Sequence, residues 1–347
     1  MRWPFALAPI RHTPRTRGTP ARLSFGMTLV ALLALTLAAC GGSGSPGASA
    51  APKGTVNVAY AGSLVNLMEH KIGPAFQAAT GYTYQGKGAG STALATQIKG
   101  KLIQPDVFIS ASAGAYTPLM GAANGNIVSW YLSFSSTQMV IGYSPHSQFA
   151  SQLQAAASGS TPWYTVLETP GLRLGRTDPT LDPKGVNTLY TMKLAEIYYA
   201  QPGLSQKILG APENTAQIFP EEDLVARLSS GQLDAGFFYL NEVKDASLPY
   251  VTLPAQINLG DPSQASYYAQ ATYTDAKGAT STANPVLYSL TIPSTVKNEA
   301  GAVAFVQYLL GSSGQGFLTA DGIMPITLKF TGDASKVPAG LSQFIKP

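Results

Sequence analysis

The chain has 347 residues and carries 22 Lys and Arg against 18 Asp and Glu. Five of the arginines lie in residues 1–39, which contain no acid, so the remainder has 17 basic and 18 acidic side chains and gives no support for nucleic-acid binding. Two histidines and no cysteine follow Cys40, which argues against internal disulfides, a zinc site built on His or Cys, and a Ser-His-Asp triad.

The N-terminal segment predicts export. Five arginines are followed by an apolar run over residues 25–39, and the run ends in Leu-Ala-Ala-Cys at Cys40. The apolar run is too short to span a membrane comfortably, so residues 1–39 are expected to be a secretory signal peptide. Leu-Ala-Ala-Cys resembles the lipobox of bacterial lipoproteins, which would leave Cys40 as the acylated first residue. An ordinary signal peptide with an incidental cysteine is the alternative. Residues 40–53 are rich in Gly and Ser and predict a flexible tether.

Strands and helices alternate in the first half of the body. Short apolar runs with β-branched or aromatic residues predict strands, and longer runs with apolar residues three or four apart predict helices. Strands are expected at 56–60, from 83 onward and at 106–110, and helices at 64–76, 93–103 and 115–121. This alternation predicts an α/β fold on a parallel, doubly wound sheet, in which ligands bind beyond the carboxyl ends of the strands.

The second half contains a further α/β unit and a helical C-terminal part. Strands are expected at 138–143, 172–176, 235–239, 250–253 and 287–292. Helices are expected at 163–167, 187–199, 223–229, 300–310 and 314–321. Residues 260–284 are polar and rich in Ser, Thr, Ala and Tyr, which predicts an excursion on the surface.

Two Gly-Ser turns stand where a strand is predicted to pass into a helix. They are Gly62-Ser63 and Gly90-Ser91. A helix N-terminus offers free backbone N–H groups, a serine adds a hydroxyl donor, and a glycine lets a ligand approach the backbone closely. Two such corners facing one cleft would bind an anion without Lys or Arg. The alternative is that each serine merely caps its helix.

Taken together, the segments resemble the solute-binding proteins of molybdate and tungstate ABC transporters, and the tungstate-type group in particular. The likeness extends over about residues 55–330. It is carried by Tyr-Ala-Gly-Ser-Leu at 60–64, Gly-Ala-Gly-Ser-Thr-Ala at 88–93, Pro-Asp-Val-Phe-Ile-Ser-Ala-Ser at 105–112, the segments 175–185, 194–199 and 230–239, and tail segments between 305 and 325. The resemblance implies a type II periplasmic-binding-protein fold of two α/β lobes joined by two crossing strands. Lobe I is expected at 54–140 and 256–347, and lobe II at 141–255.

The resemblance also implies which residues bind the oxyanion. Ser63 and Ser91, each beside its glycine, match the two anion-binding serines of the family, and Tyr239 matches a tyrosine that donates to the oxyanion. Asp182 and Glu221 match carboxylates that reach the metal atom of the oxyanion and raise its coordination from four to six. A carboxylate next to a dianion is repelled by on the order of several kcal/mol in a drying cleft. Only molybdenum or tungsten can offset this repulsion by accepting further oxygen ligands, so the pair would discriminate against sulfate and phosphate.

Three positions leave this match open. Glu222 adjoins Glu221; the spacing to Leu224 favours Glu221 but does not settle the choice. Some relatives have a second acid where this chain has Leu181, and an aspartate where it has Ser112. Neither departure removes an expected ligand.

The implied function is a non-enzymatic capture protein that needs no cofactor. It would bind molybdate or tungstate, deliver it to the permease of an ABC importer, and act as a monomer held by lipid on the outer face of the cell membrane or in the periplasm. A binding protein for sulfate, thiosulfate or an organic acid is one alternative, and an extracytoplasmic enzyme or sensor on the same lobes is another.

The segment 81–88 nearly fits a P-loop but ends in Gly88 where Ser or Thr binds magnesium, which argues against nucleotide binding.

Overall fold

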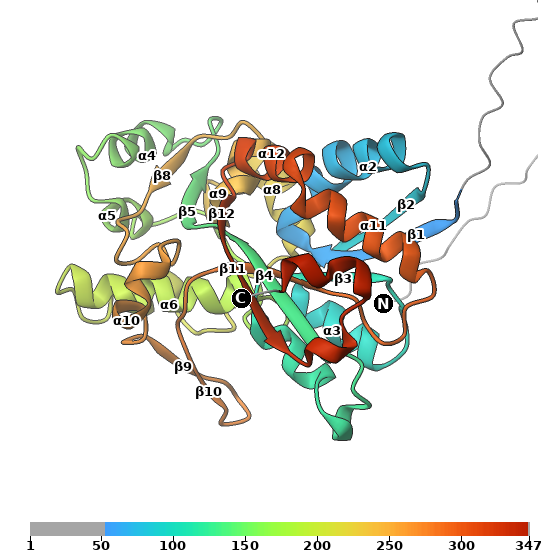
Figure 1. Ribbon diagram of the computed structural model, residues 1–347. Coiled ribbons are helices and arrows are strands. Elements are labelled where there is room, and N and C mark those ends of the chain that lie inside the picture. Colours follow the sequence, from blue (N-terminus) through green and yellow to red (C-terminus); the bar gives the residue numbers. More distant parts are fainter. Residues whose placement is uncertain (1–52, 346–347) are drawn as a thin grey trace, which may run out of the picture. The chain divides into compact units, whose positions relative to one another are not determined.

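The computed structural model describes residues 53–345, which form one compact unit (Figure 1). The predicted signal peptide, Cys40 and the predicted tether up to residue 52 lie outside the described residues. None of the helices described within this range is long and apolar enough to cross a membrane. The described part is a mixed α/β structure built on two larger sheets and one hairpin.

The first sheet has six strands in the order β12-β4-β11-β3-β1-β2. These are β1 (Thr55–Ala61), β2 (Thr83–Ala89), β3 (Val107–Ser110), β4 (Trp130–Ser136), β11 (Leu287–Thr291) and β12 (Met324–Gly332). As predicted, β1 is parallel to β2 and β3. β11 is antiparallel to β3 and β4, and β12 is antiparallel to β4. The expectation of a purely parallel sheet is therefore wrong, because the C-terminal part of the chain returns to this sheet in the opposite direction.

The second sheet has four strands in the order β6-β7-β5-β8. They are β5 (Met139–Tyr143), β6 (Leu174–Gly175), β7 (Ala235–Tyr239) and β8 (Tyr250–Thr252). β6 and β7 are parallel, whereas β5 is antiparallel to both of its neighbours. Its helices are α4 (Ala150–Ala157), α5 (Trp163–Leu167), α6 (Pro183–Tyr198), α7 (Leu204–Leu209), α8 (Glu221–Ser229) and α9 (Leu240–Asp245).

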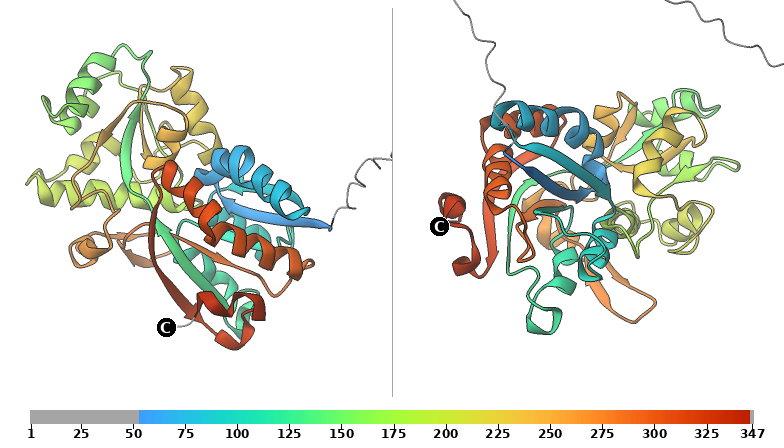
Figure 2. Two further views of the ribbon diagram at one scale, coloured as in Figure 1. Left: turned by 45° about the horizontal axis from the view of Figure 1, so that its top comes forward. Right: turned by 90° about the vertical axis from the view of Figure 1, so that its right-hand side faces the viewer.

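Helices cover both faces of the first sheet (Figure 2). Alternate residues of β1 pack into two different clusters: Val56 and Val58 join the cluster of α2 (Gly73–Thr80) and α11 (Glu299–Leu310), and Ala59 joins that of α3 (Ser91–Lys99). α2 and α11 lie side by side in Figure 2. A strand buried on both faces has a strongly specified register, which fixes where its carboxyl end lies. The last long helix, α12 (Ser312–Ala320), follows α11.

The segment after β1 is less regular than the single helix predicted at 64–76. It begins with a 3₁₀ turn over Gly62–Leu64, continues as α1 (Val65–Leu67) and a π-helical turn over Met68–Ile72, and ends as α2. Pro74 is the second residue after the π turn. A proline has no N–H to donate to the preceding turn, so a regular hydrogen-bond ladder cannot run through this point. The helix predicted at 115–121 is likewise a 3₁₀ helix, over Ala113–Leu119.

Two chain segments connect the sheets. Residues 137–138 lead from β4 to β5, and residues 253–286 lead from β8 back to β11. The two segments bond to each other: Thr137 N–H donates to Val286 O at 3.2 Å, and Met139 N–H donates to Asn258 O at 2.7 Å. The type II binding-protein architecture follows from this pairing of connections, while the residue boundaries expected for the lobes remain a prediction.

The returning segment includes the expected excursion. It holds α10 (Ala265–Tyr268) and the antiparallel hairpin of β9 (Thr272–Thr274) and β10 (Thr280–Thr282). The hairpin extends away from both sheets at the bottom of Figure 1.

Candidate functional site

The first Gly-Ser corner lies against a carboxylate of the second sheet's helices. β1 ends at Ala61 and the 3₁₀ turn begins at Gly62. A Cβ atom placed on Gly62 would lie 2.4 Å from Oε2 of Glu221. A larger residue would have to displace the Glu221 side chain, so glycine permits this close approach.

The second corner lies against the other predicted carboxylate. Gly90 precedes α3 as its N-cap residue, and a Cβ on Gly90 would lie 2.7 Å from Leu181 O and 3.3 Å from Oδ2 of Asp182. The N–H of Ala93, in the first turn of α3, donates to Leu181 O at 3.1 Å. Residues 181–182 therefore contact the N-terminal end of α3, and each corner meets one carboxylate.

The serines do not cap their helices. No side chain caps the turn after β1 or the start of α3. The Ser63 hydroxyl lies 3.0 Å from the Tyr288 hydroxyl, and the Ser91 hydroxyl accepts a hydrogen bond from Ala111 N–H at 3.2 Å. The N-cap alternative is therefore wrong for both residues. The Ser63 hydroxyl is paired with a tyrosine of β11 in the first sheet, whereas the Ser91 hydroxyl is bonded to the backbone just after β3.

Asp182 is buried and makes only part of the hydrogen bonds that a carboxylate can make. It is the N-cap residue of α6, and its Oδ1 accepts the N–H of Lys184 at 2.6 Å. Its Oδ2 is buried and accepts no hydrogen bond. A buried carboxylate oxygen without a donor is costly, which marks this atom as available for a further contact.

Glu221 is the buried member of the two adjacent glutamates. It begins α8 and is 5% exposed, while Glu222 is exposed, so Glu221 is the one that faces the corners. Oε1 of Glu221 is also buried and accepts no hydrogen bond. Each carboxylate of the pair therefore has one buried oxygen that accepts no hydrogen bond.

A buried lysine accompanies the carboxylates, contrary to the expectation that the site holds no cationic residue. The side chain of Lys184 is fully buried. Its Nζ lies 2.6 Å from Oε1 of Glu242 and 3.3 Å from Oε1 of Glu221. Sequence reasoning missed both Lys184 and Glu242. Both lie close in sequence to a predicted site residue: Lys184 is two residues after Asp182, and Glu242 is three residues after Tyr239. This proximity was the signal that could have identified them.

Tyr239 stands at the boundary between the two sheets. It ends β7, and its hydroxyl accepts a hydrogen bond from the Asn187 side chain at 2.9 Å. Its ring meets that of Tyr288, on β11, at a centroid distance of 6.4 Å. Asn241 bridges the same boundary, because its side-chain N–H donates to Ser63 O at 2.7 Å.

Burial shifts the pKa values of the ionisable groups in the cluster. Burial, with Glu242 adding to it, raises the pKa of Asp182, and burial together with the Asp182 charge raises the pKa of Glu221 well above its usual range. Burial raises the pKa of Glu242 to about 6, although Lys184 opposes the change. For Lys184, burial alone would lower the pKa, but the carboxylates of Glu242, Glu221 and Asp182 together raise it.

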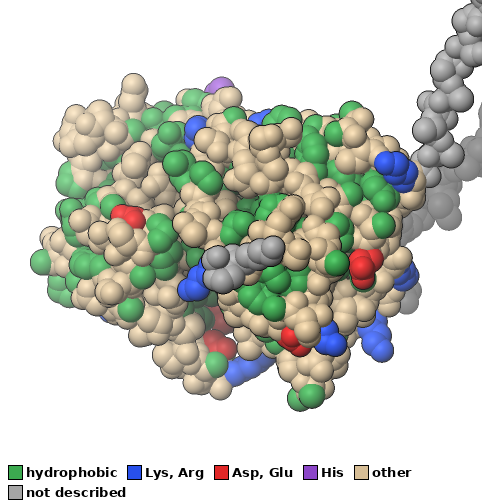
Figure 3. All heavy atoms as spheres, in the orientation of Figure 1, with side chains coloured by type: hydrophobic (Ala, Val, Ile, Leu, Met, Phe, Trp, Pro, Cys, Tyr) green, Lys and Arg blue, Asp and Glu red, His purple; other side chains and the backbone are tan. Residues whose placement is uncertain are grey.

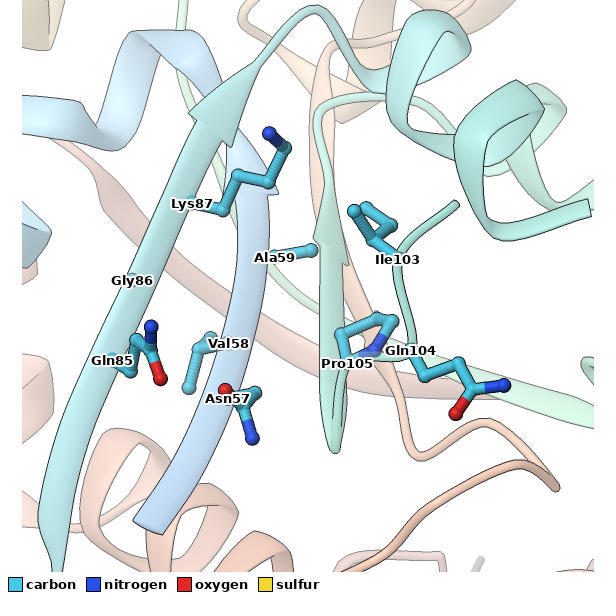
Figure 4. Close-up of a pocket in the computed structure, with 9 residues that line it drawn as sticks. All are labelled: Asn57, Val58, Ala59, Gln85, Gly86, Lys87, Ile103, Gln104 and Pro105. Atoms are coloured by element: carbon cyan, nitrogen blue, oxygen red, sulfur yellow. The ribbon is translucent and has the colours of Figure 1, made fainter. Parts of the chain in front are cut away.

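Two open cavities on the surface lie away from the predicted site residues. A cavity of about 390 Å³ lies between β1, β2 and the loop 103–105, and its residues are those of Figure 4, with Lys87 at its upper end. Another, of about 450 Å³, lies along α4 and α5. Neither is lined by a predicted site residue. On the face shown in Figure 3, Lys and Arg side chains are scattered and form no basic patch.

Comparison with known proteins gives the family. A model of the bacterial extracellular solute-binding proteins matches residues 56–323, and the chain belongs to that family. It is 31% identical over 302 residues to an uncharacterized solute-binding protein of Petrotoga mobilis, covering 84% of this chain and 90% of the relative. It is 29% identical over 315 residues to the molybdate/tungstate-binding protein WtpA of Thermococcus kodakarensis, covering 83% and 87%. The chain is thus a solute-binding protein of the transport class and not an enzyme.

Solved structures agree on the fold. The periplasmic molybdate-binding protein of Azotobacter vinelandii aligns with a TM-score of 0.52 at 17% identity, covering 78% of this chain and 98% of that protein. The sulfate-binding protein SubI of Mycobacterium tuberculosis aligns with a TM-score of 0.51 at 13% identity, covering 78% and 87%. These matches establish the periplasmic-binding-protein fold predicted from the sequence.

The raised carboxyl pKa values predict how stability depends on pH. Because Asp182, Glu221 and Glu242 hold their protons more tightly in the folded protein than in the unfolded chain, the free energy of unfolding falls as pH rises above the ordinary range of these groups. Glu221→Gln should weaken this fall and be more stable than the native chain at pH 8, by on the order of 1 kcal/mol. Denaturant unfolding at pH 5 and pH 8 measures it.

The exposed neighbour supplies the control. Glu222→Gln should leave the pH dependence of the unfolding free energy unchanged. Equal pH dependence in the native protein and Glu221→Gln would contradict the placement of Glu221 in a desolvated cluster.

Proposed function

We propose that this protein captures molybdate or tungstate between its two lobes and delivers it to an ABC importer. The observation that carries the proposal is the pairing of each glycine corner with one carboxylate, Gly62 with Glu221 and Gly90 with Asp182. The name of the relative WtpA and its similarity over most of both chains point to the same ligands.

The charges in this pairing favour a metal-centred oxyanion. Asp182 and Glu221 would repel any tetraoxo dianion by on the order of several kcal/mol at contact distances in a poorly hydrated site. The two buried oxygens that accept no hydrogen bond, Asp182 Oδ2 and Glu221 Oε1, would then supply two further ligands to molybdenum or tungsten, the second of them 3.3 Å from the Lys184 ammonium. Sulfur and phosphorus in their tetraoxo anions accept no such ligands, so sulfate and phosphate would meet the repulsion alone.

In this proposal the remaining predicted residues hold the oxygen atoms of the anion. Ser63 and Ser91 and the backbone beside Gly62 and Gly90 provide N–H and O–H donors, and Tyr239 donates from the second lobe. No cofactor takes part. The hydroxyl oxygens of Ser63, Ser91 and Tyr239 each have a protein partner in the structure described above, so the anion would replace some of these bonds on binding.

The cellular setting follows from the N-terminus. We propose that residues 1–39 direct export, that Cys40 carries the lipid anchor, and that residues 40–53 hold the monomeric body near its permease at the outer face of the membrane or in the periplasm. Mass spectrometry of the membrane-extracted protein should find an acylated Cys40 as the first residue. A protein that begins after Cys40 would contradict the anchor but not the solute specificity.

Titration calorimetry tests the ligand class. Purified protein should bind sodium molybdate and sodium tungstate tightly and sodium sulfate and phosphate at least about a hundredfold more weakly, since each factor of ten corresponds to about 1.4 kcal/mol. Equal affinity for sulfate and molybdate would overturn the argument from the carboxylates.

Neutral replacements test the two carboxylates individually. Asp182→Asn and Glu221→Gln keep the side-chain volume and should each lower molybdate affinity about ten- to hundredfold, because a neutral amide is a poor ligand for the metal centre. Calorimetric titration of each variant is the measurement, and Glu222→Gln is the matched control. A variant that retains native affinity would show that its carboxylate is not a ligand.

Gly90→Ala tests whether the corners must approach the second lobe as closely as the structure shows. The added Cβ would lie 2.7 Å from the backbone oxygen of Leu181, and backbone cannot yield as a side-chain end can. Molybdate affinity should fall about tenfold. Gly316→Ala, where a Cβ meets nothing within 4 Å, is the control and should bind as the native protein does. Native affinity in Gly90→Ala would contradict the tight corner.

A further inference from the structure

Lys184 is a fully buried lysine at the first turn of α6, and the proposed function does not use it. Removing an ammonium group from water costs several kcal/mol unless charged and hydrogen-bonding partners offset the loss. A lysine in such a place therefore requires partners that are held in position. Two carboxylates contact its ammonium group, those of Glu242 and Glu221, and a third, that of Asp182, accepts its backbone N–H.

Lys184 contacts both carboxylates that face the glycine corners, by two different groups. Its backbone N–H donates to Oδ1 of Asp182 at 2.6 Å. Its ammonium nitrogen lies 3.3 Å from Oε1 of Glu221. The first contact fixes one carboxylate through the main chain, and the second attracts the other through charge.

The ammonium group is itself held by a further carboxylate, that of Glu242. Glu242 accepts from Lys184 Nζ at 2.6 Å through Oε1, and its Oε2 accepts the N–H of Tyr239 at 2.7 Å. The ammonium also lies over the rings of Phe238 and Tyr239, at 5.6 and 5.7 Å from their centroids. Lys184 is thus anchored to the end of β7, and Glu221 is positioned relative to that strand.

We propose that Lys184 is the positioning residue of the oxyanion site, and that its ammonium group, anchored by Glu242, orients Glu221 toward the captured metal centre. The proposal rests on the proposed function. The cluster contains three carboxylates and one lysine, so it still repels dianions that cannot accept further ligands. The lysine at the same time reduces the repulsion between Asp182 and Glu221.

A double-mutant cycle on molybdate binding tests the proposal. Lys184→Met keeps the backbone N–H to Asp182 and removes only the charge, so it should lower molybdate affinity about ten- to hundredfold. In a Glu221→Gln background the same change should cost less than about threefold, because the carboxylate it acts through has gone. Calorimetry with sodium molybdate up to millimolar concentration measures all four proteins. Lys193→Met, on the exposed side of the same helix, is the control and should bind normally.

A second variant guards against a folding defect. Glu242→Gln keeps the lysine but weakens its anchor, and it should lower molybdate affinity in the same direction, by about threefold or more. Native affinity in both Lys184→Met and Glu242→Gln, or a loss in Lys184→Met that is undiminished in the Glu221→Gln background, would overturn the positioning role. Failure of the proposed function is separate, because it would appear as weak molybdate and tungstate binding by the native protein.

Discussion

The desolvated contact between two carboxylates and two glycine corners is the constraint on which the site depends. Asp182 and Glu221 are brought out of water beside each other, and Lys184 is the one cation in contact with the pair among the described residues. Such a cluster is costly to assemble, so the surrounding structure has to hold it. Three features restrict its movement: Asp182 is the N-cap residue of α6, Glu221 begins α8, and Lys184 is anchored by Glu242.

Polar groups make much of the contact between the two lobes. Asn241 donates to Ser63 O, Ala93 N–H donates to Leu181 O, and Lys71 lies 2.5 Å from Asp245 and 2.7 Å from Asp321, which joins α9 to the end of α12. Hydrogen bonds of this kind can be exchanged for bonds to water at little net cost. In the proposed function, the lobes would separate at these polar contacts to admit the solute.

Much of this arrangement was predictable from local patterns. β7 and α5 match their expected ranges, and both glycine corners fall at strand ends, because alternation and turn chemistry are local signals.

β4 was missed because its sequence contains serines that are buried, and Ser133 bonds Ser289 across the sheet at 2.8 Å. β12 was missed because its residues are mostly exposed at the sheet edge. Lys184 could not be found as a buried residue, since its burial depends on carboxylates from α8 and α9 and a lysine in a first turn normally reads as exposed.

The order of strands in the first sheet has a consequence for the newly made chain. β4 pairs only with β11 and β12, which are the last two strands to be synthesised, and β3 takes β11 as its second neighbour. Pairings at such long sequence separation form slowly, and they cannot form at all until the C-terminal segment has left the ribosome. The first sheet therefore stays incomplete until translation ends, which would favour passage of an exported chain through a secretion channel before folding is finished.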